Sequence, residues 1–331
     1  MAQFFDRPER LLRLAARAEP RFRRRFLEVV GLIRNERTIE QLIVLLQSGN
    51  LQQALVSAEI AALRLGSMWG DVYVGSASET AGFVGSSLQT LVDFNRVNSR
   101  ALSALELNQL RLVQGFTQQQ VLATRTALAQ GTALGLNPVQ QARAFRDSIG
   151  LTPHQVEIVN NYRRKLENGD LSPLQNQLRD RRFDSSVRRA ASGGRPLTQT
   201  QIDTMVGRYR DRWIKFRAET IARTEALDAV HQGNQEMYRQ AIENGTLRAD
   251  EVYREWSDSD DNRVRDTHMS MDGQRRGLTE PFLSPSGAQL MRPLDPNAPA
   301  EERIKCRCGI LTRFTDTAKK ENLEAQQSLA G

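Results

Sequence analysis

The residues best suited to chemistry lie near the C-terminus, in the run from 256 to 273 and in Cys306-Arg307-Cys308. Imidazole nitrogen and thiolate sulfur are the ligands that Zn²⁺ prefers in tetrahedral sites. His268, Cys306 and Cys308 could therefore share one zinc ion, with Asp272 or water as the fourth ligand. The alternative is a pair of buried thiols, because Cys-x-Cys lacks the turn of Cys-x-x-Cys and two cysteines in a reducing compartment are more often buried.

The acidic residues Asp258, Asp260 and Asp261 resemble the start of a calcium loop. The glycine at the sixth position and the glutamate at the twelfth are missing, however. We therefore expect a turn in which aspartate side chains cap backbone N–H groups and pair with Arg263 and Arg265.

Catalysis by His268 is an alternative of a different class. A histidine beside carboxylates can act as a general base in a nuclease or a transferase. No nucleophile elbow, no Gly-x-Gly-x-x-Gly and no Gly-x-x-x-x-Gly-Lys-Ser/Thr motif accompanies it. The other two histidines, His154 and His231, are interpreted as surface or helix-packing residues. The sequence therefore gives an enzyme weak support.

The elements that must position these residues are mostly helices. Apolar residues recur at three- and four-residue spacing through 38–137, a stretch without proline or lysine. Thr117 is expected to start a helix, and Asn137-Pro138 and Thr152-Pro153 to start the next two. Thr198 to about Asn244 contains no proline and predicts one helix of about 70 Å.

The pattern changes after this long helix. Gly207 and Gly233 could interrupt the helix itself. Beyond the helix, apolar and polar residues alternate in 252–256 and 304–311, as in half-buried strands. Five of the eleven prolines fall in 281–299, so long loops separate the strands. The expected fold is mainly α, a helical N-terminal two thirds with a long helix leading into a small α+β C-terminal module. The expected divisions are 1–114, 115–245, 246–316 and a tail at 317–331.

The formal net charge is +7, and 41 of the 46 basic residues are arginine. A GC-rich coding genome explains the arginine bias but not its clustering. Residues 1–37 hold ten arginines against five acids, and 177–217 hold ten arginines and one lysine against four acids. Residues 38–137 are nearly neutral, with five arginines against six acids.

Both basic segments are candidate contacts for an acidic protein surface or for DNA phosphates. The candidate side chains are Arg21, Arg23, Arg24, Arg25, Arg181, Arg182, Arg188 and Arg189. The second segment also contains Asp180 and Asp184, so ion pairs within the fold or between subunits are an equal alternative. A plain DNA-binding protein is a further alternative, for which affinity should fall steeply with salt.

Membrane and secretory classes are not expected. The longest aliphatic run, residues 42–46, is far shorter than the roughly 20 residues that span a bilayer. The first eight residues lack a basic region followed by an apolar one, so we expect a cytosol-like compartment.

An ordered set of residues in the C-terminal half resembles the Mu F-type minor head protein (phage head morphogenesis) family of tailed bacteriophages. The set comprises Ile221-Ala222-Arg223-Thr224-Glu225, Gly233-Asn234, Tyr238, Trp256, Asp260-x-x-Arg263-x-Arg265-x-x-His268-x-x-Met271-Asp272-Gly273, Pro293, Asp295-Pro296 and Cys306-Arg307-Cys308. Upstream, Ala142-x-x-Phe145-Arg146 and Leu178-Arg179-Asp180 are also similar, so the resemblance covers about 115–315.

This resemblance implies a minor structural protein of the virion that acts in head assembly, and in DNA packaging and ejection, rather than an enzyme. The implied partners are the portal protein, other head proteins and packaged double-stranded DNA. The protein would be oligomeric or multi-copy in the virion, at the head interior or portal vertex, after assembly in the host cytoplasm. The shared residues then form a candidate structural polar network that locks the C-terminal module onto the long helix: Arg223, Glu225, Asp260, Arg263, Arg265, His268 and Asp272.

Overall fold

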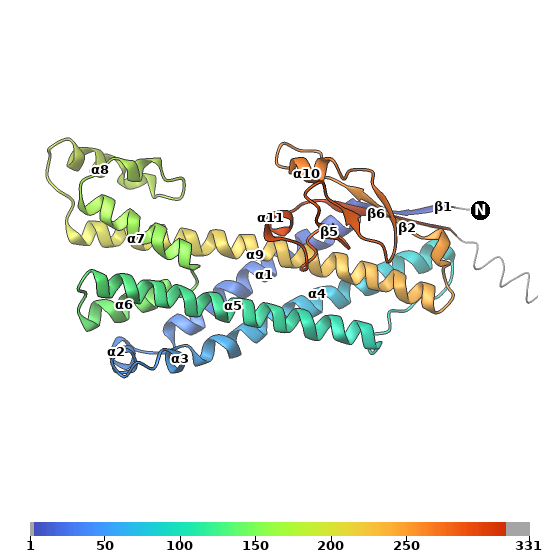
Figure 1. Ribbon diagram of the computed structural model, residues 1–331, viewed down its shortest axis with the longest axis horizontal. Coiled ribbons are helices and arrows are strands. Elements are labelled where there is room, and N and C mark those ends of the chain that lie inside the picture. The colour runs from blue at the N-terminus through green and yellow to red at the C-terminus, as the bar shows by residue number, and fades with distance from the viewer. Residues whose placement is uncertain (1–2, 316–331) are drawn as a thin grey trace, which may run out of the picture. The chain divides into compact units, whose positions relative to one another are not determined.

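The computed structural model describes residues 3–315 and is mainly helical with a small antiparallel sheet (Figure 1). The helices are α1 (Pro8–Asn35), α2 (Ile39–Gln47), α3 (Leu51–Ala54), α4 (Val56–Leu88), α5 (Ser99–Ala133), α6 (Pro138–Ser148), α7 (Pro153–Glu167), α8 (Asp184–Ala191), α9 (Gln199–Glu243), α10 (Asp266–Met269) and α11 (Ala300–Arg303). The strands are β1 (Gln3–Asp6), β2 (Tyr253–Ser257), β3 (Arg275–Gly277), β4 (Phe282–Leu283), β5 (Gln289–Leu290) and β6 (Gly309–Thr315). The predicted fold class is confirmed; the expected tail at 317–331 lies outside the described residues.

The described chain forms two compact units built from separate segments. Unit 1 comprises residues 3–22, 67–109 and 220–315, and unit 2 comprises 23–66 and 110–219. The long helices α1, α4, α5 and α9 each contribute residues to both. Among residues 3–315, no helix combines the length and apolar character needed to cross a membrane.

Helix starts follow capping chemistry. Asn137 and Thr152 each accept a hydrogen bond from the backbone N–H three residues on, and the side-chain oxygen of the glutamine there accepts from the backbone N–H of the capping residue. Both predicted starts are confirmed. The start predicted at Thr117 is wrong, because α5 runs through that position. Val113 and Phe116 are buried there, so the apolar face that packs in the core continues across the expected cap.

The long helix is confirmed as α9, a single element of 45 residues. The capping residue is Thr198, whose hydroxyl accepts from the Gln201 N–H. Neither Gly207 nor Gly233 interrupts the helix, because a glycine weakens a helix without preventing its hydrogen bonds. At Gly233 the missing side chain has a packing use, since the backbone of α4 lies against it.

The sheet has the strand order β1-β6-β2-β3, and every pairing is antiparallel. β1 from the N-terminus lies beside β6 from the C-terminus (Figure 1). Burial alternates along β2 and β6, as the sequence pattern predicted. The strand expected over 304–311 begins later, at Gly309, because Lys305 has a left-handed backbone (φ 60°) that turns the chain after α11. Cys306 and Cys308 therefore precede the strand.

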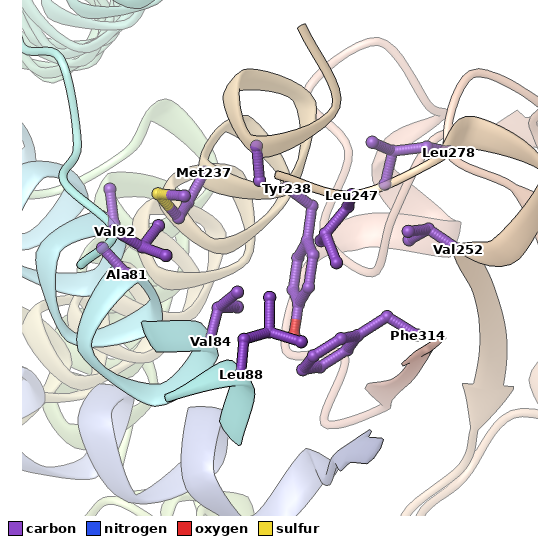
Figure 2. Close-up of a cluster of buried hydrophobic side chains, with 12 residues drawn as sticks. Ala81, Val84, Leu88, Val92, Met237, Tyr238, Leu247, Val252, Leu278 and Phe314 are labelled. Atoms are coloured by element: carbon purple, nitrogen blue, oxygen red, sulfur yellow. The ribbon is translucent and has the colours of Figure 1, made fainter. Parts of the chain in front are cut away.

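A buried cluster in unit 1 joins α4, α9 and the sheet (Figure 2). Tyr238 of α9 and Phe314 of β6 meet at its centre, with ring centroids 5.7 Å apart. The cluster consists of Ala77, Ala81, Val84, Leu88, Val92, Met237, Tyr238, Ala241, Leu247, Val252, Leu278 and Phe314. The C-terminal module is thus attached to the helices of unit 1 by apolar packing.

Unit 2 has its own aromatic core. The rings of Tyr162 and Tyr209 stack with centroids 4.2 Å apart. Gly150 has φ +90°, and a Cβ atom there would lie 2.7 Å from Val30 Cγ1. Only glycine satisfies both the backbone conformation and the lack of space.

Candidate functional site

The His268, Cys306 and Cys308 side chains come together in unit 1, as the zinc interpretation requires, and the two thiols are buried, as the alternative requires. His268 is held on the short helix α10, and the two cysteines lie between α11 and β6. Both sulfur atoms are 3.4 Å from His268 Nδ1. All three residues are at most 2% exposed. The ring of Trp256 stands edge-on to the imidazole at 5.3 Å, so the cluster has an apolar boundary.

The second nitrogen of His268 faces Glu302 of α11. Nε2 lies 2.9 Å from Glu302 Oε2, although the N–H direction is not aligned for a good hydrogen bond. The hydroxyl groups of Ser284, Ser286 and Thr267 donate to the Glu302 carboxylate. Burial raises the pKa of Glu302, but these donors outweigh it and the net pKa is lowered. Glu302 is therefore a buried anion beside the imidazole. It was missed in the sequence because no motif spacing connects it to His268.

The two thiols perturb each other. The hydrogen bond from Cys308 lowers the pKa of Cys306 to about 5, while burial opposes this and His268 assists it. The pKa of Cys308 is raised, because it donates to Cys306 and is itself buried. The cluster therefore favours one thiolate in this buried space.

The remaining histidines have ordinary structural surroundings. His154 lies near Glu157 on the surface of α7, with 81% of its side chain exposed. His231 is buried in α9, and burial lowers its pKa to about 3, so it is neutral.

The residues proposed as one polar network have separate partners. Arg223 lies 3.7 Å from Glu19 of α1, and Glu225 pairs with Arg303 at 3.0 Å. Thr224, between them, accepts a hydrogen bond from the Lys305 N–H. α9 is therefore joined through adjacent residues to α1 and to the segment that carries the cysteines.

The acidic run forms a turn that caps its own backbone. Asp258 accepts from the Asp260 N–H, Asp261 from the Arg263 N–H, and Asp272 from the Asp258 N–H. Asp260 has φ 44°, a left-handed conformation suited to a tight turn. The arginine that pairs with Asp261 is Arg307, between the two cysteines. Arg265 instead donates to the Ile304 carbonyl.

A second buried network was not predicted. Asp6 of β1 is 1% exposed and accepts bonds from Arg10, Asn234 and Tyr238. Arg10 also donates to Thr80 of α4. The resemblance had indicated Asn234 and Tyr238 but not their partner, because Asp6 lies more than 220 residues away in the sequence.

A third buried contact centres on Asp228 of α9. It accepts from Trp69 Nε1 at 3.2 Å and from Arg292 Nη2 at 2.9 Å. Asp228 is fully buried, and Arg292 is also bonded to Gln232. This pair joins the loop before Pro293 to α9.

The arginines of the second basic segment are largely paired within unit 2. Asp180 binds Arg182 at 2.7 Å and Arg208 at 3.1 Å, and Asp184 binds Arg179 at 2.9 Å. Arg181, Arg188 and Arg189 remain exposed. Much of this segment therefore serves internal ion pairs.

Replacing Asp180 with asparagine is expected to lower the free energy of unfolding by about 1 kcal/mol at pH 7. Burial raises the pKa of Asp180, but bonds from Arg182 and nearby guanidinium charges outweigh it and lower the net pKa. A carboxyl with a lowered folded pKa stabilises above its unfolded pKa, about 3.9, and loses this as pH falls through the folded value. Urea unfolding at several pH values should show that the difference in unfolding free energy between the wild type and Asp180→Asn, the gap, closes in acid. Asp203→Asn, at an exposed pair with Arg163, should cost less than about 0.5 kcal/mol; a gap for Asp180→Asn that persists at pH 2 contradicts the prediction.

The first basic segment lies on α1 and differs from the second. Phe22 and Phe26 are buried in the core, whereas Arg21, Arg23 and Arg24 are exposed. Arg23 faces Glu219 at 3.6 Å and Arg25 faces Glu28 at 2.9 Å. Among residues 3–315, no acidic side chain lies within ion-pair distance of Arg21 or Arg24.

These features define a mainly helical protein in which His268, Cys306 and Cys308 form a buried cluster. Residues 156–311 match the family model described as Phage Mu protein F like protein. Residues 156–311 therefore form a Mu F-like family domain, and the resemblance found in the sequence is confirmed over those residues. No curated protein and no solved structure matches the chain.

Proposed function

We propose that the protein is a minor structural protein of a tailed-phage head, located at the portal vertex, where it acts in head assembly and in DNA packaging and ejection. The match of residues 156–311 to the Mu F-like family carries this proposal. Its partners would be the portal protein, other head proteins and packaged double-stranded DNA. The protein would be multi-copy in the virion and would assemble in the host cytoplasm.

The burial of His268 supports a structural role over a nuclease or a transferase. A general base must lie within hydrogen-bond reach of its substrate, directly or through one water. His268 is 1% exposed, and its two nitrogens face the cysteine sulfurs and Glu302. These buried contacts join α10 to the segment before β6.

Unit 2 has an apolar surface suited to a protein partner. A hollow of about 640 Å³ lies between α1 and α4, with Leu32 46% and Ile60 67% exposed at its edge. Leu63, one helical turn beyond Ile60, is 55% exposed. Apolar side chains gathered at a hollow are typical of protein contact surfaces. We propose that the helices of residues 1–114 face partner subunits.

The exposed arginines of α1 should provide the contact with an acidic portal surface. Replacing both Arg21 and Arg24 with glutamine is expected to weaken portal binding at low salt by roughly tenfold, through slower association. The charge-matched control is the Arg181→Gln, Arg188→Gln double variant, which should bind normally. Equal effects of the two variants contradict a specific contact, and loss of DNA binding without loss of portal binding would assign the arginines to DNA. Deleting residues 1–37 is no test, because it removes β1 and the buried Phe22.

Quantitative composition of full and emptied particles tests the proposal as a whole. We expect a small fixed number of copies per portal in full particles, and a lower number after ejection if the protein leaves with DNA. Absence from both kinds of particle, with normal head yield after deletion of the gene, would refute the virion role. Incubation with plasmid DNA and divalent metals provides the separate enzymatic test: turnover lost in His268→Ala would favour a nuclease.

A further inference from the structure

The strongest feature that head assembly leaves unexplained is the arrangement of His268, Cys306 and Cys308. Two sulfur atoms converge on one imidazole nitrogen, each 3.4 Å from Nδ1, and the three ligand atoms all lie within 4.8 Å of one another. An imidazole nitrogen has a single lone pair or a single proton in the ring plane, so it forms one good hydrogen bond. Hydrogen bonding therefore accounts for one of the two contacts.

A tetrahedral metal centre accounts for both contacts. Zn–S and Zn–N bonds of about 2.3 and 2.05 Å place the sulfur and nitrogen atoms of a tetrahedron about 3.6 Å apart. The observed sulfur–nitrogen separations of 3.4 Å are close to this edge. Charge also agrees, because two thiolates and one divalent cation form a neutral unit. Such a unit is far less costly to bury than free thiolates.

The surroundings of His268 have the form of an outer shell. Imidazole ligands of zinc commonly place their second nitrogen against a carboxylate, which fixes the tautomer. Glu302 Oε2 lies 2.9 Å from Nε2, and the hydroxyl groups of Ser284, Ser286 and Thr267 hold that carboxylate in place. A proton on Nε2 leaves the lone pair of Nδ1 directed at the two sulfurs.

We propose that His268 Nδ1 and the thiolates of Cys306 and Cys308 bind one structural Zn²⁺, which fastens α10 to the segment that precedes β6. Both sulfurs bind as thiolates, so any proton that remains on a thiol is released to solvent when the ion binds. Among residues 3–315 the cluster has three protein ligands, and the fourth position is assigned to water. Two sulfurs and an imidazole favour zinc over magnesium or calcium, which take oxygen ligands.

Metal analysis of the full-length chain, purified without chelators, tests this proposal. We expect about one zinc per chain in the wild type and at least a tenfold lower content in the Cys306→Ser, Cys308→Ser double variant. His154→Ala, which changes an exposed histidine, should retain full zinc. Because the cysteine variant could unfold, cobalt substitution of the wild type gives an independent measurement: tetrahedral thiolate ligation produces strong visible bands and sulfur-to-cobalt charge transfer.

Glu302→Gln provides a variant that keeps all three ligands. Zinc affinity, measured by competition with a chromogenic chelator, should fall by roughly 10- to 100-fold. The proposal is overturned if wild-type protein takes up no zinc from an equimolar solution, if the cysteine variant holds as much zinc as the wild type, or if the two sulfurs are isolated as a disulfide. These readouts are independent of portal binding, so the outcome for zinc and the outcome for head assembly are distinguishable.

Discussion

Replacing Asp6 with alanine is expected to lower the free energy of unfolding by about 3–5 kcal/mol, because it removes the fully buried partner of the partly buried Arg10 guanidinium. Arg10 donates to both Asp6 oxygens and would keep only its bond to Thr80. The Tyr238 hydroxyl also loses its acceptor in the buried core, and Asn234 keeps only its bond to Thr80. Each unsatisfied polar group adds its own desolvation cost.

Urea unfolding followed by circular dichroism measures this loss. The matched control is Asp250→Ala, which removes a carboxylate that pairs with Arg248 and is 67% exposed; because solvent screens this pair, the variant should unfold at nearly the same urea concentration as the wild type. Asp6→Asn keeps the size and one acceptor, so it should fall between the two. Similar losses for Asp6→Ala and Asp250→Ala would show that the network of β1 contributes little.

The second large effect is expected at Gly233, where alanine should destabilise the protein by about 1–3 kcal/mol or more. A Cβ atom at this position would lie 2.3 Å from the Tyr73 carbonyl oxygen and 3.1 Å from the Ala77 nitrogen. Both atoms belong to the backbone of α4, which cannot rotate away as a side chain can. The helices of unit 1 would have to separate, at the expense of the packing around Met237 and Tyr238.

Gly207 on the same helix provides a control of opposite sign. A Cβ atom there meets only the end of the flexible Arg210 side chain, at 3.9 Å. Gly207→Ala should therefore stabilise the protein by roughly 0.5–1 kcal/mol, since alanine loses less backbone entropy in a helix. Thermal melts of the two variants should shift in opposite directions; a shift of the same sign would contradict the packing at Gly233.

Local signals in the sequence were sufficient where a few neighbouring residues decide the structure. Asn137 and Thr152 were recognised as caps because the groups that they bind are three residues away. The local signal at Thr117 gave a wrong prediction, because burial of the apolar face of α5 outweighs the capping preference of one residue. Nothing in the sequence indicated the left-handed backbone of Lys305, which is why β6 begins later than predicted.

The candidate site could be predicted in part from the residue types in the sequence. The types of His268, Cys306 and Cys308 indicated a common centre, and the structure brings them together. Glu302 was not foreseen, because acidic residues at the start of a short helix are ordinary. The aspartates of the acidic turn were expected to pair with the nearby Arg263 and Arg265, whereas folding brings Arg307 to Asp261.

The sequence by itself determined the helices, the α+β character of the C-terminal module, the Mu F-like domain and the residue types of its buried centre. These depend on periodicity, capping and composition, which act within about a turn or two of the chain. Only the tertiary structure decided that β1 pairs with β6 and that Asp6 reaches Asn234 and Tyr238. Such contacts close loops of more than two hundred residues. They are selected by burial of a shared core, because the preferences of neighbouring residues do not reach that far.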